Sequence, residues 1–341
     1  EVHAIAVAFA LCIGFLLYRY IELPIRHAEI KISRKLVGAT ISVSLTLALT
    51  PFWITLAHSS TVDYTQVRRV NHGFGVACEF NQDFTPKAEC RNSEKPTLLV
   101  WGDSFAMHLV PGIIATTDAG VVQATRSVCG PFIGMAPIDN ITYTRSWAKL
   151  CLAFNQSVFD YLSATPSIKT VVLSSPFEQF LSTGDNTRSW RSLKIVGGQL
   201  VEQEPTVYGA VEAMRKTVEK LRELGKQVVI VAPPPMSGFD SGRCLERKAT
   251  GLLILGVISD CNIPISDYHK KQELVLDFLQ QVQRELVPVV YFDEILCSKL
   301  SCSTLLDGKF VYRDSGHLSY DGSQIVAKKM KLGDLLQTVA R

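Results

Sequence analysis

The sequence predicts an α/β protein: a doubly wound parallel sheet preceded by two transmembrane helices. Short β-branched runs recur along the chain after residue 95 and alternate with amphipathic stretches. Two uncharged runs lie near the N-terminus, and eight of the nine Cys follow them. Apolar residues make up 47% and charged residues 20%, which excludes a disordered or fibrous chain. A net charge of +3 without a basic run gives no reason to expect a nucleic-acid partner.

The two uncharged runs cover residues 4–17 and 36–57. The second is long enough to cross the hydrocarbon core of a bilayer as a helix, with a buried helix of a soluble protein as the alternative. The connection at 19–35 is rich in Arg and Lys, and short basic loops stay in the cytoplasm. We therefore expect the second helix to run outward and everything after about residue 58 to lie outside the cytoplasmic membrane. The chain begins without Met, so we expect it to be the C-terminal part of a longer protein.

The cysteines support an exported domain. An even number of Cys outside the cytoplasm favours disulfides, and short loops favour pairing between neighbours in sequence. Free buried thiols are the alternative. No C-x-x-C occurs and no His stands at ligand spacing from a Cys pair, so we predict no metal site. The expected pairs are Cys78–Cys90, Cys129–Cys151, Cys244–Cys261 and Cys297–Cys302, which leaves Cys12 in the first uncharged run.

Residues 59–95 are polar and irregular, which is typical of a linker, and they contain a Cys loop; the α/β domain then has the range 96–341. Continuous apolar runs bounded by Gly, Pro or Ser indicate strands buried on both faces. Amphipathic helices are expected at 207–225, ending at Gly225, and at 322–340. Strands that alternate with helices indicate a parallel sheet. The expected strands lie within 97–105, 120–127, 170–175, 227–235 and 287–294.

Two short motifs fall where a parallel sheet forms its sites, at the carboxyl ends of strands. Ser104 follows the first strand in "WGDSF", and Asp314 precedes His317 by three residues in "RDSGHLSYDG". A hydroxyl nucleophile needs a base, and the base needs a partner that orients it. We predict Ser104 as nucleophile, His317 as base and Asp314 as its partner. The alternatives are an ordinary helix cap for Ser104 and an ordinary loop histidine for His317.

An oxyanion also needs hydrogen-bond donors. The backbone N–H of Ser104, at the start of a helix, is one candidate. The second strand is followed by "RSVCGPFIG", in which Gly130 or a neighbour is a further candidate. His108, one helical turn after Ser104, is interpreted as a pocket-lining or structural residue.

The two motifs resemble the first and last blocks of the SGNH (GDSL-like) hydrolases, over roughly residues 95–341. In addition, "YRYIELPIRH" at 18–27 resembles the end of the tenth transmembrane helix of acyltransferase-3 membrane proteins. One branch of that family carries a periplasmic SGNH domain, as in bacterial O-antigen and other surface-glycan O-acetyltransferases. The resemblance implies a flavodoxin-like SGNH fold in which Ser104 is the nucleophile, His317 the base and Asp314 the partner of that base.

One block of that family is absent. The third strand is followed by "SSPFEQF" rather than a G-x-N-D segment, so no oxyanion Asn can be assigned there. Asn155 is a remote candidate, and the second block of the family maps its oxyanion glycine near Gly130.

The resemblance implies an O-acyltransferase, with acetyl as the expected acyl group and a glycan hydroxyl as acceptor. It implies acetyl-CoA as donor to the membrane part, no cofactor bound by the chain itself, and two further partners: the lipid bilayer and the rest of the chain's own acyltransferase-3 domain. The expected location is the bacterial inner membrane, with the C-terminal domain in the periplasm. A carbohydrate esterase that uses water as acceptor is one alternative, and a non-catalytic glycan-binding domain is the other, favoured by the missing block.

Overall fold

The computed structural model describes residues 62–184, 188–236, 238–252 and 260–339, with short stretches before residue 62. The chain forms two compact units, Glu1–Ser60 and Thr61–Arg341. The first contains a short π-helix, η1 (Tyr18–Glu22). Most of the uncharged runs at 4–17 and 36–57 lies outside the described residues. Within the part that is described, no helix combines the length and apolar character needed to cross a membrane.

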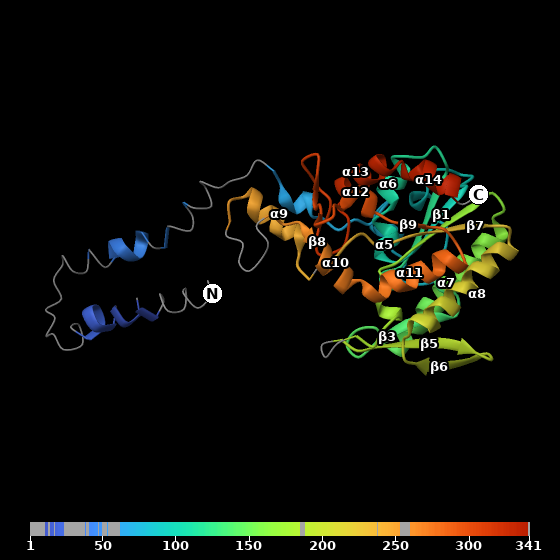
Figure 1. The fold of residues 1–341 in the computed structure, drawn as a ribbon, viewed down its shortest axis with the longest axis horizontal. Coiled ribbons are helices and arrows are strands. Elements are labelled where there is room, and N and C mark those ends of the chain that lie inside the picture. Colours follow the sequence, from blue (N-terminus) through green and yellow to red (C-terminus); the bar gives the residue numbers. More distant parts are fainter. Residues whose placement is uncertain are drawn as a thin grey trace. The chain divides into compact units, whose positions relative to one another are not determined.

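The centre of the second unit is a parallel sheet of five strands in the order β2-β1-β4-β7-β9 (Figure 1). Every strand pair in it is parallel. All residues of β1, β2 and β4 are buried, as expected when helices cover both faces. The strands are β1 (Leu98–Gly102), β2 (Val121–Thr125), β4 (Thr170–Ser174), β7 (Gln227–Val231) and β9 (Val289–Val290), so all five predicted strands are present.

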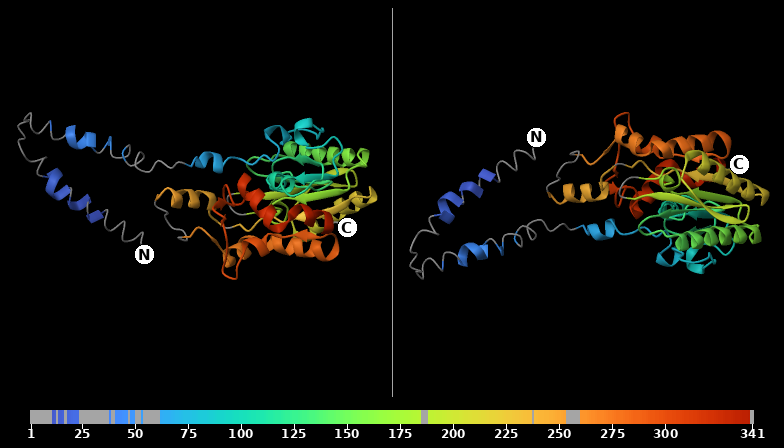
Figure 2. Two further views of the ribbon diagram at one scale, coloured as in Figure 1. Left: turned by 90° about the horizontal axis from the view of Figure 1, so that it is seen from above. Right: turned by 90° about the horizontal axis from the view of Figure 1, so that it is seen from below.

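Helices cover the two faces of this sheet (Figures 1 and 2). One face carries α7 (Arg145–Ala164), α8 (Val207–Glu223) and α11 (Glu273–Glu285), packed through one hydrophobic cluster. The other carries α6 (Val110–Ile114), α13 (Tyr320–Met330) and α14 (Leu332–Val339), packed through a second. The predicted helix at 207–225 is α8, and the chain turns at Gly225 with φ +69°. The predicted helix at 322–340 is two helices, because Lys331 adopts a left-handed conformation between them.

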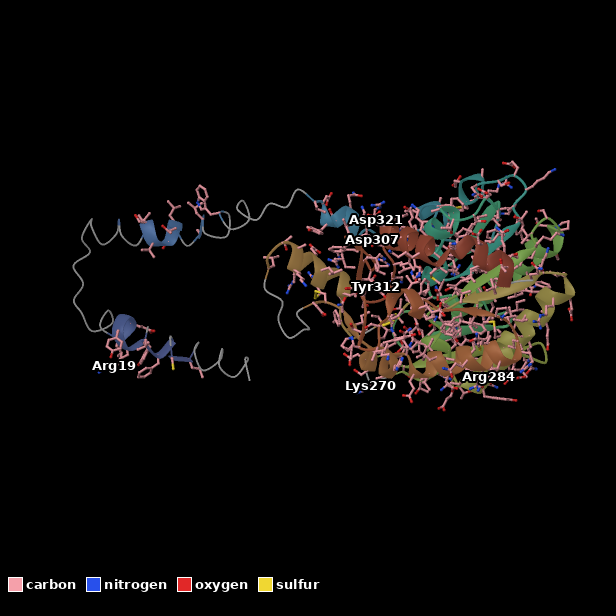
Figure 3. The ribbon with its side chains drawn as sticks, turned by 45° about the horizontal axis from the view of Figure 1, so that its top comes forward. Arg19, Lys270, Arg284, Asp307, Tyr312 and Asp321 are labelled. Atoms are coloured by element: carbon pink, nitrogen blue, oxygen red, sulfur yellow. A yellow bond between two sulfur atoms is a disulfide. The ribbon has the colours of Figure 1, made fainter. Side chains whose placement is uncertain are left out.

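Shorter elements connect these layers. Buried Tyr312 lies inside the domain, whereas exposed Lys270 and Arg284 lie at its edge (Figure 3). The short helices are α4 (Tyr64–Val67), η2 (Val76–Cys78), η3 (Ala88–Cys90), α5 (Ser104–Met107), η4 (Glu178–Phe180), α9 (Ser241–Ala249), α10 (Ile265–Lys271) and α12 (Asp293–Leu296). Two small antiparallel pairs are β8 (Ile263–Pro264) with β10 (Ser301–Cys302), and β11 (Leu305–Leu306) with β12 (Lys309–Phe310).

A second sheet, not predicted from the sequence, lies apart from the core sheet (Figure 1). It is antiparallel and consists of β3 (Met135–Asp139), β5 (Trp190–Val196) and β6 (Gln199–Gln203). β6 has no fully buried residue, so it lacks the apolar run that marks the core strands. The Gly197-Gly198 turn has positive φ at both residues, which is typical of a two-residue hairpin. This Gly pair was the sequence feature that could have indicated the β5–β6 hairpin.

The segment at 62–95 has little regular structure, in keeping with its irregular sequence, but it packs firmly against the sheet. The Phe80 N–H donates to Thr125 O over 2.9 Å, and Arg91 bridges to Val122. Phe80 and Phe84 are buried in the main hydrophobic cluster. This extension therefore covers the otherwise open edge of β2.

All four disulfides have the sequential pairing that the sequence suggested. They join Cys78 to Cys90, Cys129 to Cys151, Cys244 to Cys261 and Cys297 to Cys302. In the described residues Cys12 is a free, exposed thiol.

Candidate active site

The turn after β1 places Ser104 at the carboxyl end of the core sheet. Gly102 has φ +155°, and a Cβ there would lie 1.9 Å from Ser174 O, so only Gly fits. Asp103 caps α5, since its Oδ1 accepts the Phe105 N–H at 2.9 Å. Ser104 is the first residue of α5, and its N–H has no acceptor inside the helix.

A tight loop presents the histidine. The Arg313 N–H donates to His317 O at 2.9 Å, which closes the loop. Inside it, Asp314 Oδ1 accepts the N–H groups of Gly316 (3.0 Å) and His317 (2.8 Å). A Cβ on Gly316 would lie 2.4 Å from the Met236 sulfur, so glycine lets the loop pack closely. These backbone bonds, together with the Arg313 guanidinium 3.3 Å from Asp314 Oδ2, hold Asp314 beside the ring of His317.

The structure brings the three predicted residues together in one hydrogen-bonded chain. Ser104 Oγ lies 2.9 Å from His317 Nε2, and His317 Nδ1 lies 2.9 Å from Asp314 Oδ2. Burial opposes ionisation of Asp314, but the hydrogen bond and charge of His317, with the charge of Arg313, hold its pKa well below the usual range. An ionised Asp314 accepts a hydrogen bond from Nδ1–H, which assigns the proton to Nδ1 and leaves Nε2 as acceptor for the Ser104 hydroxyl.

A second carboxyl lies beneath this chain. Asp103 is fully buried, and its Oδ2 accepts a hydrogen bond from Ser175 Oγ at 2.6 Å. Burial raises the pKa of Asp103 to about 6, against the hydrogen bonds from Ser175 and Phe105 and the charge of His317.

His108 supports the loop that contains His317 and is not itself placed as the base for Ser104. It is 1% exposed, and its Nδ1 accepts the Leu318 N–H at 3.3 Å. Burial, followed by the charges of His317 and Arg313, holds the pKa of His108 well below its usual range. The ring is therefore neutral and supports the residue that follows His317.

Ser104 and His317 open into a cavity of about 240 Å³ at the carboxyl end of the core sheet. The segment after β2 contributes Val128, the segment after β4 contributes Gln179, and the inserted sheet contributes Trp190. The complete lining is Asp103, Ser104, Phe105, Val128, Pro176, Glu178, Gln179, Arg188, Trp190 and His317. A nucleophile, its base and a confined space thus meet at the place where doubly wound sheets form their sites.

Residues 77–331 match the family model described as SGNH domain (fused to AT3 domains). The chain belongs to this SGNH family. No curated protein matches it. Among solved structures, this SGNH domain is similar to the periplasmic domain of the Salmonella ser. Paratyphi A lipopolysaccharide acetyltransferase. That match has 14% identity and a TM-score of 0.52, and covers 83% of this chain and 97% of the other.

A second similar structure is the inhibitor-bound aryl esterase of M. smegmatis. It has 12% identity and a TM-score of 0.39, and the match covers 72% of this chain and 99% of the other. At such identities the Salmonella structure shows the fold that it shares with this SGNH domain, a central parallel sheet flanked by helices.

The two other predicted oxyanion residues do not line the cavity with Ser104. Gly130 packs against Phe180, where a Cβ would come within 2.7 Å of the ring. Asn155 is fully buried, and its amide Nδ2 donates to the carbonyls of Gly130 (2.9 Å) and Phe132 (3.0 Å). Both N–H groups of Asn155 are thus in use, which corrects the expectation that it serves an oxyanion: it supports the loop after β2.

An amide that sequence reasoning missed does line the SGNH cavity. Gln179 lies in η4, shortly after β4, in the position along the fold where the G-x-N-D segment was expected. Its Nε2 is 3.4 Å from each of three acceptors, Asp103 Oδ2, Ser175 Oγ and Val128 O. These bonds are long for an N–H donor, so the amide is only loosely held. An amide within a few residues of the third core strand was the available sequence indication.

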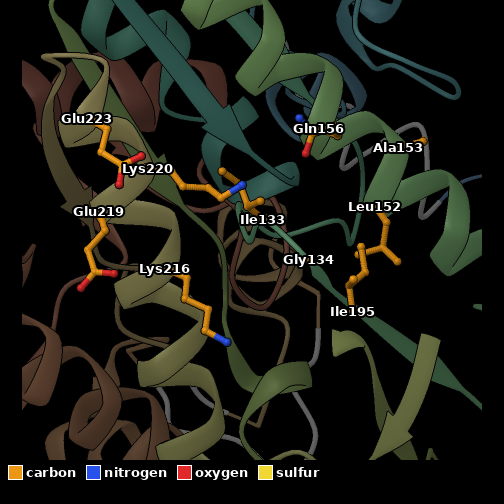
Figure 4. A pocket seen from close by; sticks show the side chains of 10 residues that line it. All are labelled: Ile133, Gly134, Leu152, Ala153, Gln156, Ile195, Lys216, Glu219, Lys220 and Glu223. Carbon is orange, nitrogen blue, oxygen red and sulfur yellow. The ribbon is translucent and has the colours of Figure 1, made fainter. Parts of the chain in front are cut away.

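A larger cavity, of about 600 Å³, lies between α7 and α8 (Figure 4). Apolar side chains line part of it, including Leu152 and Ile195, and Lys216 and Lys220 reach over it from α8. No Ser, Cys, His or Asp is among its described lining residues. The larger cavity therefore has no candidate nucleophile. We take the smaller cavity as the candidate active site because it contains Ser104 paired with His317.

Proposed function

We propose that this SGNH domain is an O-acyltransferase that places an acyl group, in the first instance acetyl, on a sugar hydroxyl of a bacterial surface glycan such as O-antigen. The observation that carries the proposal is the hydrogen-bonded chain from Ser104 through His317 to Asp314 inside a cavity. Membership of a family described as fused to AT3 domains, and the similar fold of a lipopolysaccharide acetyltransferase domain, support transfer to a glycan.

The first half of the reaction forms an acyl enzyme. Ser104 Oγ attacks the carbonyl carbon of the acyl donor while its proton moves to His317 Nε2. Ionised Asp314 stabilises the imidazolium that results. The negative charge on the carbonyl oxygen is held by the N–H of Ser104, at the start of α5, and by the side-chain amide of Gln179. The intermediate collapses, the leaving group departs with the proton from Nε2, and the acyl group remains on Ser104.

The second half transfers the acyl group. A sugar hydroxyl gives its proton to His317 Nε2 and its oxygen attacks the acyl carbonyl carbon. Collapse of this intermediate breaks the bond to Ser104 Oγ, which takes the proton back from Nε2. The products are an O-acylated sugar and the original enzyme, so no oxidant, metal or bound cofactor enters the balance.

The proposed setting is the bacterial inner membrane, with residues 4–17 and 36–57 as membrane helices and the SGNH domain in the periplasm. The basic connection at 19–35 supports this orientation. The remainder of an acyltransferase-3 domain would take the acetyl group from acetyl-CoA and deliver it across the bilayer. Four disulfides in the second unit fit an oxidising compartment.

The test follows p-nitrophenol release and sugar acetylation by the purified protein, with p-nitrophenyl acetate as donor and an oligosaccharide as acceptor. Ser104→Ala and His317→Ala should each reduce both activities by a factor on the order of 10³ or more. Retention of both activities in both variants would refute the catalytic proposal and leave a glycan-binding domain. Ser104-dependent release that yields only free acetate would identify an esterase.

A further inference from the structure

One wall of the nucleophile cavity comes from outside the core sheet. Arg188 and Trp190 line the cavity together with Ser104 and His317. Trp190 is the first residue of β5, in the inserted antiparallel sheet, which forms a layer of its own in Figure 1. Trp190, from a separate sheet, and Arg188, two residues before that strand, thus lie across the cavity from the core sheet's own residues.

The wall is held rigidly. Trp190 pairs with Asp139 in the β3–β5 ladder, and the backbone N–H of Trp190 donates to Thr183 O at 2.7 Å. The ring of Tyr143 stacks on Trp190, with centroids 6.0 Å apart and planes 14° from parallel. The Arg188 guanidinium lies 5.3 Å from the centre of the Trp190 ring and 5.6 Å from that of Tyr143. An indole ring and a guanidinium thus lie side by side on the cavity wall, positioned by contacts within the protein.

The charge of this wall is balanced internally. Arg188 Nε lies 3.1 Å from Asp139 Oδ2. Asp139 Oδ1 accepts the N–H groups of Ile141, Thr142 and Tyr143. Burial opposes ionisation of Asp139, yet these N–H groups and Arg188 keep its pKa below the usual value. Because the positive charge of Arg188 is matched by this carboxylate, the wall favours a neutral ligand with hydroxyl groups over an anion.

The chemistry that fits this wall is that of a sugar. A pyranose ring has an apolar face of C–H groups, which an indole can cover, and a rim of hydroxyls that accept from a guanidinium and donate to a carboxylate. Glu178 lines the cavity as well and is paired with Lys271 at 3.0 Å. At about 240 Å³ the cavity is smaller than a typical ligand pocket, so it suits a single ring and not a longer segment of glycan.

We propose that Trp190 and Arg188 form the acceptor subsite, which holds one neutral pyranose ring with a hydroxyl directed at the acyl group on Ser104. This assignment rests on the proposed function and deepens it, since it names the groups that make a sugar, and not water, the acceptor. Bound against Trp190, the ring also displaces water from the cavity that Ser104 and His317 share with it.

The experiment measures two quantities separately: the affinity for a glycoside, and the division of the acetyl group between the sugar and water. Methyl glycosides of glucose, galactose, mannose and rhamnose, with methyl glucuronide as the charged comparison, are titrated against Ser104→Ala protein by ligand-detected NMR. The same glycosides are then acceptors for the active protein with p-nitrophenyl acetate, and the ratio of acetylated sugar to free acetate is measured.

Trp190→Ala should weaken binding of the neutral glycosides at least tenfold and reduce the ratio of transfer to hydrolysis at least tenfold. Trp190→Phe should retain part of the glycoside affinity and part of the transfer-to-hydrolysis ratio, because phenylalanine keeps a flat ring. The matched control is Trp147→Phe, which alters a second ring in contact with Tyr143 (4.7 Å between centroids) and is not among the cavity residues. Its transfer ratio should stay within about twofold of wild type.

The outcomes separate the two proposals. Ser104-dependent hydrolysis with an unchanged transfer ratio in Trp190→Ala would overturn the subsite and leave the acyl enzyme intact. Absence of saturable binding for every glycoside, or preference for the glucuronide, would likewise overturn it. Loss of all Ser104 dependence would instead refute the function on which the subsite rests.

Discussion

At the scale of single residues, Asp103 combines two conflicting roles. It caps α5 through the Phe105 N–H, which favours an ionised carboxylate, and it is fully buried, which disfavours one. Burial is the larger effect and raises its pKa from 3.8 to about 6. Between these two pH values the folded protein keeps a proton on Asp103 that the unfolded chain has released. Stability therefore falls as the pH rises through this window and levels off above it.

Asp103→Asn should remove this pH dependence. Relative to wild type, the variant should gain roughly 2 kcal/mol of stability on going from pH 4 to pH 6, since one pKa unit corresponds to about 1.4 kcal/mol and this range covers only part of the transition. Urea unfolding of both proteins across this range measures the difference. A difference in stability that stays constant with pH would show that Asp103 ionises normally in the fold.

At the scale of elements, the segment after β4 places an amide in the cavity, in the part of the chain where the G-x-N-D block was expected. Phe177 adopts a left-handed conformation with φ +61°, which is rare for an aromatic residue. This turn starts η4 and brings Gln179 back over the carboxyl end of β1. The left-handed residue is buried in the core, two residues before the loosely bonded amide that lines the cavity.

Gln179→Ala should reduce kcat for p-nitrophenyl acetate by roughly 10²-fold while changing KM little, because an oxyanion donor acts mainly in the transition state. Gln179→Glu should be slower still, since it places a carboxylate where negative charge develops. The control is Gln156→Ala, which removes an exposed amide of α7 that bonds only Asp160 among the described contacts. Equal losses in kcat for Gln179→Ala and the control would remove Gln179 from the mechanism.

At the scale of the whole domain, the extension at 62–95 links the two loops of the candidate active site. Asn71 is 3% exposed, and its Nδ2 lies 3.2 Å from His108 O and 3.4 Å from Leu318 O. One carbonyl ends the helix that carries Ser104, and the other directly follows His317. Arg68 adds a bond to Arg313 O at 2.9 Å. The extension at 62–95, whose sequence is typical of a linker, thus bonds to both the Ser104 segment and the His317 loop, which lie more than two hundred residues apart.

Asn71→Ala should therefore lower activity beyond its cost in stability. Losing a buried amide that bonds several carbonyls should cost about 1–3 kcal/mol. At a temperature where the variant remains folded, kcat should fall about tenfold or more because the distance between Ser104 and His317 is no longer fixed. The control is Asn92→Ala, in the same extension, whose Oδ1 accepts the Val121 N–H at 2.6 Å. A similar loss of stability in both variants with no selective loss of kcat in Asn71→Ala would assign Asn71 a purely structural role.

The sequence predicted those parts of this domain that depend on local pattern. The five core strands are continuous apolar runs, and Ser104, Asp314 and His317 stand beside turns with their own glycines, so short stretches were sufficient. The inserted sheet was missed because two of its strands, β5 and β6, are half exposed and lack a continuous apolar run. Gln179 and Asn71 were missed because only the tertiary fold brings their hydrogen-bond partners near them. Asn155 was a remote oxyanion candidate for the same reason, since nothing local indicates that Gly130 and Phe132 take both of its N–H groups.

The pairing of the cysteines has a consequence for how the domain is made. The four bridges close loops with separations of 12, 22, 17 and 5 residues, and none encloses or crosses another. The first cysteine of each bridge therefore has its partner in the next cysteine along the chain. A chain that emerges from its N-terminal end and meets an oxidant at once reaches the native pairing without reshuffling, because no wrong bridge has to be opened first. Production should thus depend on a thiol oxidant and not on a disulfide isomerase.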